Sequence, residues 1–125
     1  MYNRDSFEAY LKANHERFLQ DFEQIINIPS VAAYGTGIQP MADLVAERFR
    51  KLGAKVVTQY PLDNGGSPVV YAEFDGASDT TMLIYNHYDV QPEDPRDLWV
   101  TEPFKLTRKG WHVVRARRYT TTKAI

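Results

Sequence analysis

The sequence lacks cysteine, long apolar runs and, beyond Glu102, acidic residues. Without cysteine no disulfide framework can form, and any metal site has to be built from histidine and carboxylate ligands. No apolar run approaches the ~20 residues that a membrane span needs, and residues 1–8 lack the basic and then apolar order of a secretory signal. These absences predict a soluble protein of the cytoplasm.

The missing acids divide the chain into two parts of opposite charge. Residues 1–102 have a net charge of −8 and residues 103–125 one of +7, which together give the net charge of −1. A change this abrupt indicates a tail with its own role or of different origin. The composition is otherwise globular, with 43% apolar and 13% aromatic residues, and the length of 125 residues fits one domain.

The first 30 residues predict a helix. Asp5 followed by Glu8 resembles a capping box, which marks a helix start. One apolar stripe, spaced for a helix of about 20 residues that packs on the core, then consists of Leu11, His15, Phe18, Phe22 and Ile25. Pro29 ends the helix, because the residue before a proline resists the helical conformation. We expect His15 to be a packed or surface histidine and not a metal ligand.

A second helix is predicted after a glycine-containing loop at 30–39. Pro40 suits its first turn, Lys51 its last turn and Gly53 the position after its end. Its apolar face is expected to consist of Met41, Leu44, Val45, Phe49 and Leu52.

Three strands are predicted next, at 54–60, 69–74 and 81–86, separated by turns rich in glycine, asparagine and aspartate. The third, Thr-Met-Leu-Ile-Tyr-Asn, lacks strict alternation, which indicates a strand buried on both faces of a sheet. Two helices followed by three strands predict the α/β class, with the helices packed on a central sheet.

The candidate chemistry follows the third predicted strand, in His87-Tyr88-Asp89-Val90-Gln91-Pro92. A histidine at the end of a strand lies where α/β sheets place their sites. Asp89 can reach back to the imidazole of His87, fix its tautomer and leave the other ring nitrogen free for a metal ion. By itself, this short pattern favours a structural pair at a strand end over a zinc ligand.

Other motifs around this pattern favour the zinc ligand over the structural pair. They are Ile28-Pro29-Ser30-Val31 after the first helix, Leu83-Ile84-Tyr85-Asn86 before the His87 motif, and Trp99 with Pro103-Phe104. In their order and spacing, over residues 6–109, the chain resembles the two-zinc metallopeptidase and amidohydrolase family of succinyl-diaminopimelate desuccinylase, acetylornithine deacetylase, glutamate carboxypeptidase and carnosine-type dipeptidases. Asp94-Pro95 and Leu98-Trp99 look most like the dipeptidase branch. The resemblance implies the N-terminal portion of a zinc-exopeptidase-like catalytic domain.

The resemblance also implies roles for single residues. His87 would be a ligand of one of two zinc ions, Asp89 the catalytic-site carboxylate that orients it, and Trp99, Pro103 and Phe104 parts of the surround. In complete relatives the metals polarise the scissile carbonyl and lower the pKa of a bridging water, and a glutamate passes the proton to the leaving amine. The implied substrates are dipeptides or N-acyl amino acids, including N-succinyl diacids. Cobalt or manganese could replace zinc, and full-length relatives often dimerise.

Several parts of the family pattern are missing. The family requires a Gly-Arg-Gly stretch, an Asp-Asp-Lys-Gly stretch whose first Asp bridges the zincs, a Glu-Glu pair, a further acid and a distant histidine, and this chain has none of them. Catalytic zinc typically takes three protein ligands. We therefore expect the chain as it stands to be an inactive fragment of a metal-dependent hydrolase.

Residues 110–125 are expected to be an aberrant basic tail, distinct from the catalytic-domain portion at 1–109. Back-translated and read one base later, residues 110–118 permit Asp-Gly-Met-Leu-Tyr-Gly-Arg-Gly-Val. Read two bases later, residues 119–125 permit His-Asp-Asp-Lys-Gly-His. The resemblance requires both segments in this order. We hypothesise that the coding sequence shifts frame near Lys109 and again near Arg118, so that His112 is not a ligand.

Two other interpretations stay open. A non-catalytic α/β binding module would use Arg115, Arg117 and Arg118 as a basic arm for an acidic partner, with nucleic acid a weak expectation for so short a run. A regulatory pseudoenzyme would dimerise with a full-length relative. The resemblance implies that the third predicted strand lies inside a larger sheet, so missing strand neighbours predict aggregation or a partly molten state of the isolated chain.

Overall fold

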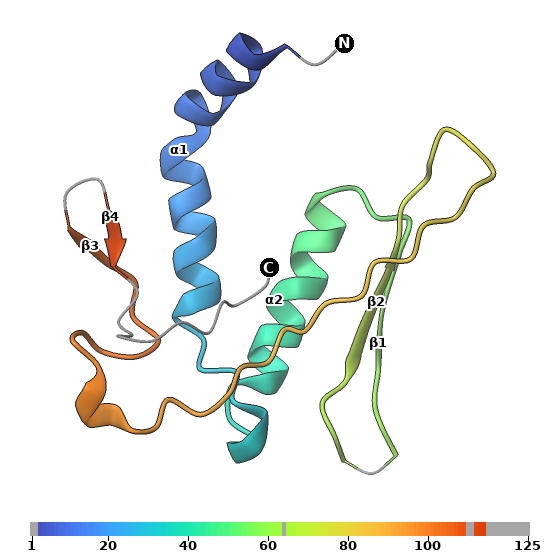
Figure 1. Cartoon of the computed structure of the whole chain (residues 1–125). Helices are drawn as coiled ribbons and strands as arrows, with labels where there is room; N and C mark the ends of the chain where they lie inside the picture. Colours follow the sequence, from blue (N-terminus) through green and yellow to red (C-terminus); the bar gives the residue numbers. More distant parts are fainter. Residues whose placement is uncertain (1–2, 64, 110–111, 115–125) are drawn as a thin grey trace.

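The computed structural model describes residues 3–63, 65–109 and 112–114. Helix α1 (Arg4–Ile26), the 3-10 turn η1 (Ala32–Tyr34) and helix α2 (Ile38–Lys51) precede a hairpin of strands β1 (Val56–Tyr60) and β2 (Val69–Glu73). The 3-10 turn η2 (Arg96–Leu98) and a hairpin of strands β3 (Thr107–Lys109) and β4 (His112–Val114) follow. Figure 1 shows α2 between the β1–β2 hairpin on one side and α1 with the β3–β4 hairpin on the other.

The best-packed part of the chain is α2 with the β1–β2 hairpin. The two strands pair antiparallel, and α2 packs against both of them. Phe49 of α2 meets Phe74 edge to face, with ring centroids 6.0 Å apart. The buried apolar residues lie on α2 and in the loop before it: Val31, Ile38, Met41, Ala42 and Ala46. This helix on a sheet agrees with the predicted α/β class.

The end of α2 differs in one respect from the prediction. Gly53 follows the helix with a φ of 88°, as expected of a glycine at this position. Leu52 does not belong to the apolar face and is 73% exposed, because it is the C-cap residue and so lies beyond the last helical turn.

Helix α1 forms close to the predicted bounds but does not pack as expected. Its N-cap is Asn3, whose side chain accepts a hydrogen bond from the Ser6 amide, and Asp5 lies in the first turn instead. No residue of α1 is buried, so the stripe does not form the expected closed core, although its members Phe18, Phe22 and Ile25 are partly buried. A polar contact attaches the helix to α2, where Arg48 pairs with Asp21 at 3.4 Å.

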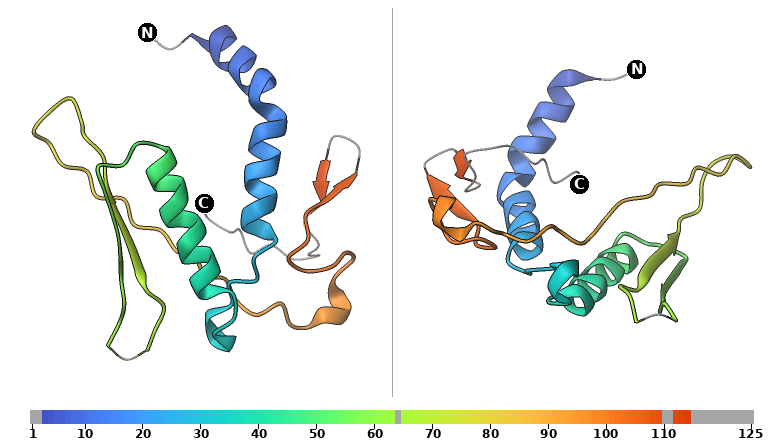
Figure 2. Two further views of the ribbon diagram at one scale, coloured as in Figure 1. Left: turned by 180° about the vertical axis from the view of Figure 1, so that it is seen from behind. Right: turned by 60° about the horizontal axis from the view of Figure 1, so that its bottom comes forward.

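The third predicted strand does not form. Residues 81–86 have no strand partner, because the described residues contain only the two-stranded β1–β2 and β3–β4 sheets. The apolar side chains from Met82 to Tyr85 are therefore 71–85% exposed. Figures 1 and 2 show this segment (yellow to orange) returning past β2 and α2 as an extended chain, outside the hairpin. His87 thus follows an unpaired segment and not the end of a strand.

The C-terminal part contains a second, short hairpin, in which Thr107–Lys109 and His112–Val114 pair antiparallel as β3 and β4. Residues 110–111 and 115–125, which carry most of the expected tail, lie outside the described residues. Among the residues that the structure covers, no helix has the length and apolar content to cross a membrane.

Candidate functional site

The candidate site is the His87–Asp89 pair. Nδ1 of His87 lies 3.1 Å from Oδ1 of Asp89. Because an ionised carboxylate can only accept, a hydrogen bond at this contact requires the proton on Nδ1, and in the neutral imidazole Nε2 then keeps its lone pair. The His87 side chain is 70% exposed and that of Asp89 29% exposed. The imidazole therefore faces solvent, whereas the carboxylate that contacts it is partly buried. The Tyr85 ring meets the imidazole edge to face at 5.5 Å.

The segment that carries this pair is anchored to the loop before α2. Ser30 is fully buried, and its hydroxyl donates a hydrogen bond of 2.9 Å to the carbonyl oxygen of Tyr88. The Val90 amide donates one of 2.8 Å to the carbonyl oxygen of Ser30. Val31 and Val90 form an isolated parallel bridge beside these bonds. A segment without a sheet is thereby tied to the buried core.

Tyr88 attaches the same segment to the β1–β2 side. Its side chain points away from those of its neighbours His87 and Asp89, as alternation in an extended chain requires, and its hydroxyl donates to the carbonyl oxygen of Pro68. Burial raises the pKa of the Tyr88 phenol, and the negative charge of Asp89 raises it further. The phenol therefore stays a neutral donor at physiological pH.

The anchoring loop owes its path to a glycine. Gly37 has a φ of 66°, and a Cβ at this position would lie 2.5 Å from the carbonyl oxygen of Pro29. The loop folds back on itself there, and Val31 donates its amide hydrogen to the carbonyl oxygen of Thr36 at 3.0 Å. The Thr36 hydroxyl contacts the Pro29 carbonyl oxygen at 3.4 Å. These contacts fix the backbone around Ser30.

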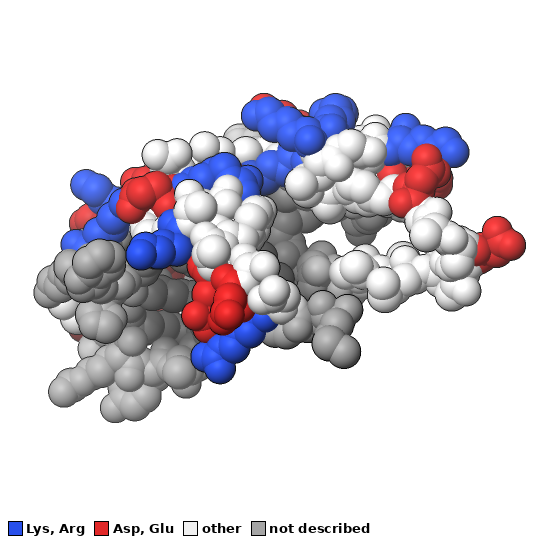
Figure 3. Space-filling view, turned by 90° about the horizontal axis from the view of Figure 1, so that it is seen from above, with Lys and Arg blue, Asp and Glu red and all other residues white. Residues whose placement is uncertain are grey.

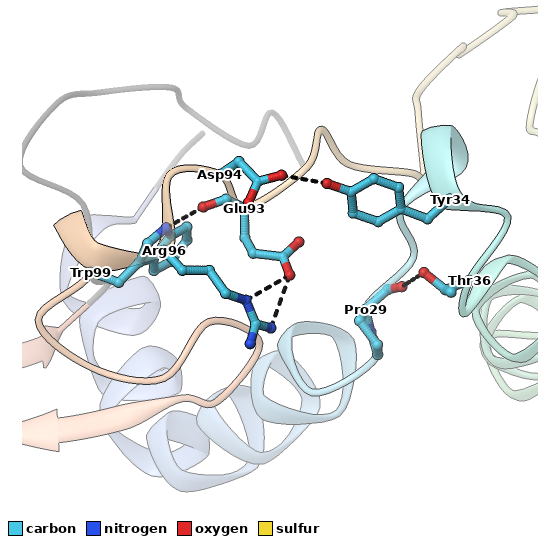
Figure 4. A network of polar contacts seen from close by, with 7 residues as sticks. All are labelled: Pro29, Tyr34, Thr36, Glu93, Asp94, Arg96 and Trp99. Carbon is cyan, nitrogen blue, oxygen red and sulfur yellow. Dashed lines mark hydrogen bonds and ion pairs between the residues drawn. The ribbon is translucent and has the colours of Figure 1, made fainter.

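A second polar network continues from this loop to η2 (Figure 4). The Tyr34 hydroxyl donates to the carboxylate of Asp94, which raises the pKa of Tyr34. Arg96 pairs with Glu93 at 2.9 Å, and the indole nitrogen of Trp99 donates to the Glu93 carbonyl oxygen. Trp99 is partly buried through this contact.

The rest of the expected surround lies next along the chain. Pro103 and Phe104 form a partly buried turn, in which Phe104 has a φ of 57°. Among the residues that the structure describes, no hydrogen bond or ion pair joins this turn to His87 or Asp89.

Sequence reasoning missed the roles of Ser30 and Tyr34. Ser30 stood out only as part of a landmark, and Tyr34 not at all. A hydroxyl directly after Pro29, in a short loop between two helices, was the available signal, because buried serines usually bond to a backbone group. Its partner, 58 residues away, leaves no local trace.

The described residues do not by themselves form a metal site. None of their His, Asp and Glu side chains gather in a group of three or more able to hold an ion. His15 lies exposed on α1, and the side chain of His112 is outside the description. The donor set is therefore one imidazole with an oriented free nitrogen, which is fewer ligands than catalytic zinc takes.

Comparison with known proteins gives a consistent set of relatives, although no protein-family model matches the chain. The chain is 34% identical over 114 residues to the Cys-Gly metallodipeptidase dug1 of Schizosaccharomyces pombe, covering 82% of this chain and 24% of that protein. It is 31% identical over 113 residues to the human Beta-Ala-His dipeptidase, covering 78% of this chain and 22% of the relative.

A solved structure is similar as well. An M20 family metallo-carboxypeptidase from Sulfolobus solfataricus matches with a TM-score of 0.70 and 37% identity, over 78% of this chain and 22% of the other. The chain thus spans less than a quarter of the length of these three proteins.

Proposed function

This chain belongs to the M20 family of metallopeptidases, as a fragment related to its dipeptidases, and from that premise we propose that it carries one corner of a dipeptidase active site. The supporting observation is the 3.1 Å contact between His87 Nδ1 and Asp89 Oδ1, which leaves Nε2 of an exposed imidazole free. A carboxylate on one ring nitrogen is the usual device that orients a histidine toward a metal ion.

In this proposal His87 is a metal ligand and Asp89 holds its ring in place. Zinc is the proposed metal. The substrate class is a small dipeptide, since the relatives include a Cys-Gly metallodipeptidase and a Beta-Ala-His dipeptidase. A cytoplasmic location is part of the same proposal and is tested by cell fractionation.

The chain by itself is proposed to be inactive. One imidazole cannot hold a catalytic zinc, which takes about three protein ligands, and the described residues offer no larger cluster. Incubation of the purified chain with zinc and the dipeptides Cys-Gly and β-Ala-His should therefore show no hydrolysis above that of the buffer. Hydrolysis that disappears in the His87→Ala variant would contradict this.

A chimaera tests the role of His87 directly. Residues 3–106 replace the matching segment of the Schizosaccharomyces pombe metallodipeptidase, which supplies the remainder of the protein. We expect hydrolysis of Cys-Gly by the chimaera, and a loss of at least about 100-fold when His87→Ala removes a ligand. His15→Ala, at an exposed position of α1, is the matched control and should retain activity. Full activity of the His87→Ala chimaera would refute the assignment.

The division at residue 109 is likewise a proposal. The support for an out-of-frame tail is the change of net charge and the two back-translated segments in family order. Sequencing of the gene from the codon for Thr107 onward tests it: base slips near Lys109 and Arg118, with the frame resuming at Asp-Asp-Lys-Gly, are expected. An intact frame through these codons would refute it.

The alternative, a binding module with a basic arm, depends on Arg115 to Arg118, which lie outside the described residues. On the face drawn in Figure 3, Lys and Arg side chains lie beside Asp and Glu and do not gather into a patch of one sign. If the arm binds an acidic partner, removal of residues 115–125 should abolish a salt-sensitive association. Unchanged binding after the deletion would exclude the arm.

A further inference from the structure

We propose that Ser30 is a positioning residue for the His87–Asp89 pair and acts through the backbone on both sides of Asp89. This inference rests on the proposed function in one respect, because the importance of the orientation depends on His87 being a ligand. The orientation itself can be measured without any metal.

The hydrogen bonds of Ser30 bracket Asp89. The hydroxyl of Ser30 holds the carbonyl group of Tyr88, and the carbonyl oxygen of Ser30 receives the amide of Val90, at 2.9 Å and 2.8 Å. These are the peptide groups directly before and after the Asp89 residue. With both fixed, the backbone angles that aim the carboxylate at His87, two residues earlier, have little freedom.

Ser30 is well suited to this role because it is itself immobilised. It is fully buried, next to Val31, which is 1% exposed. Its amide donates to the Ile28 carbonyl oxygen at 2.9 Å. The loop that follows turns back at Gly37, whose backbone lies close to the carbonyl group of Pro29. The core around α2 therefore fixes Ser30, and Ser30 transmits that position to a pair at the surface.

The need for such an anchor follows from the unpaired segment at 81–86. In a sheet, neighbouring strands would fix the chain that leads into His87, but here no strand partner is described. An exposed imidazole on an extended chain loses its fixed geometry unless a nearby point is tied down. Removal of the Ser30 hydroxyl would leave the carbonyl oxygen of Tyr88 without this partner. Of the two hydrogen bonds on either side of Asp89, only that from the Val90 amide would then remain.

The test reads the tautomer of His87 from its imidazole nitrogen-15 chemical shifts, in the full chain, without metal, at a pH where the ring is neutral. The His87→Gln variant assigns the signals. In the wild type the form protonated at Nδ1 should dominate, because Asp89 accepts from that nitrogen. Ser30→Ala should lose this dominance, and Ser30→Thr, which keeps a hydroxyl, should retain it.

Thr36→Val is the matched control. It removes a hydroxyl contact to Pro29 in the same loop without touching Tyr88 or Val90, so it should leave the tautomer unchanged. A folded Ser30→Ala protein, judged by circular dichroism, with the wild-type tautomer would overturn the proposal. A change as large in Thr36→Val would overturn it too, because the effect would then be one of general loop stability.

The wild type offers a test that needs no variant. A scalar coupling through the hydrogen bond is expected between the Val90 amide nitrogen and the Ser30 carbonyl carbon, with slowed exchange of the Val90 amide hydrogen. Its absence, with exchange at the rate of an unfolded chain, would overturn the proposal even if the Ser30 variants fail to fold. Zinc binding by His87 is measured separately, so failure of the metal assignment leaves these results intact.

Discussion

Among single residues, two glycines in one loop show how backbone conformation and close contact contribute separately. Gly35 and Gly37 have nearly the same left-handed φ, 64° and 66°. A Cβ at Gly35 would meet nothing within 4 Å, whereas one at Gly37 would lie 2.5 Å from the Pro29 carbonyl oxygen. Only Gly37 is therefore required for steric reasons, and it is the one that lies against the segment holding Ser30.

We predict that the two alanine variants differ in stability. Gly35→Ala should lower the free energy of unfolding by about 1–2 kcal/mol, the cost of a left-handed conformation. Gly37→Ala should cost roughly 2–4 kcal/mol, because a backbone carbonyl must also move. Urea unfolding followed by circular dichroism measures both. Equal losses would show that the contact with Pro29 does not constrain the loop.

The candidate pair could be predicted from sequence, whereas its anchor could not. His87 and Asp89 are two positions apart, so their contact depends on local geometry. The hydrogen bond from Ser30 spans 58 residues and exists only after α2 and the loop before it have packed. A pattern along the chain carries no information about such a contact.

At the scale of elements, the predictions succeeded where an element forms from its own residues. Both helices and the β1–β2 hairpin lie close to their predicted positions, since periodicity, caps and turns are local. The strand at 81–86 failed because it needs a neighbouring strand and none of the described elements supplies one. The stripe of α1 is only partly buried, because the described elements cover it incompletely. Apolar pattern predicts what a segment could bury and not what covers it.

The junction between α2 and β1 gives a prediction about pH. Asp43 of α2 accepts hydrogen bonds of 2.9 Å from the side-chain amides of Gln59, in β1, and of Gln39. These bonds, that of Gln59 first, lower the pKa of Asp43 below its ordinary value of 3.8. Their contribution to stability is therefore present above pH 3.8 and is lost as the pH falls through the lower pKa of the folded state.

Asp43→Ala should accordingly lower the thermal midpoint near neutral pH and have little effect in acid below the lowered pKa of the folded state, where the wild-type carboxylate is protonated as well. Asp79→Ala, in an exposed turn, is the control and should leave the midpoint unchanged at both pH values. A loss of stability in Asp43→Ala that is as large in acid as near neutral pH would contradict the assignment.

For the molecule as a whole, the amount of exposed surface is the outstanding property. A compact monomer of 14.4 kDa exposes about 6,800 Å², whereas this chain exposes 10139 Å². Four consecutive apolar side chains, from Met82 to Tyr85, are among the exposed ones. Extended apolar chain with unpaired backbone groups is a template for pairing with another chain.

We therefore predict concentration-dependent self-association through residues 82–85. The double substitution Met82→Lys and Ile84→Lys should reduce it strongly, as measured by sedimentation velocity over a range of protein concentrations. The control adds the same charge elsewhere, with Leu52→Lys and Leu62→Lys at two other exposed positions. Equal effects of both pairs would indicate general charge repulsion, and a monomeric wild type at all concentrations would refute the prediction.

The two hydrogen bonds that join Ser30 to Tyr88 and Val90 also have a consequence for the order of folding. The two ends that they join enclose α2 and the β1–β2 hairpin, so their formation closes a large loop. Closure of a flexible loop of this size costs entropy, and that cost falls once the helix and hairpin inside it have formed from local contacts. We therefore predict that the geometry of His87 becomes fixed only after α2 and the β1–β2 hairpin have formed. If His87 has the proposed role of a metal ligand, binding of a metal ion through it would report on the completed fold and not on early folding intermediates.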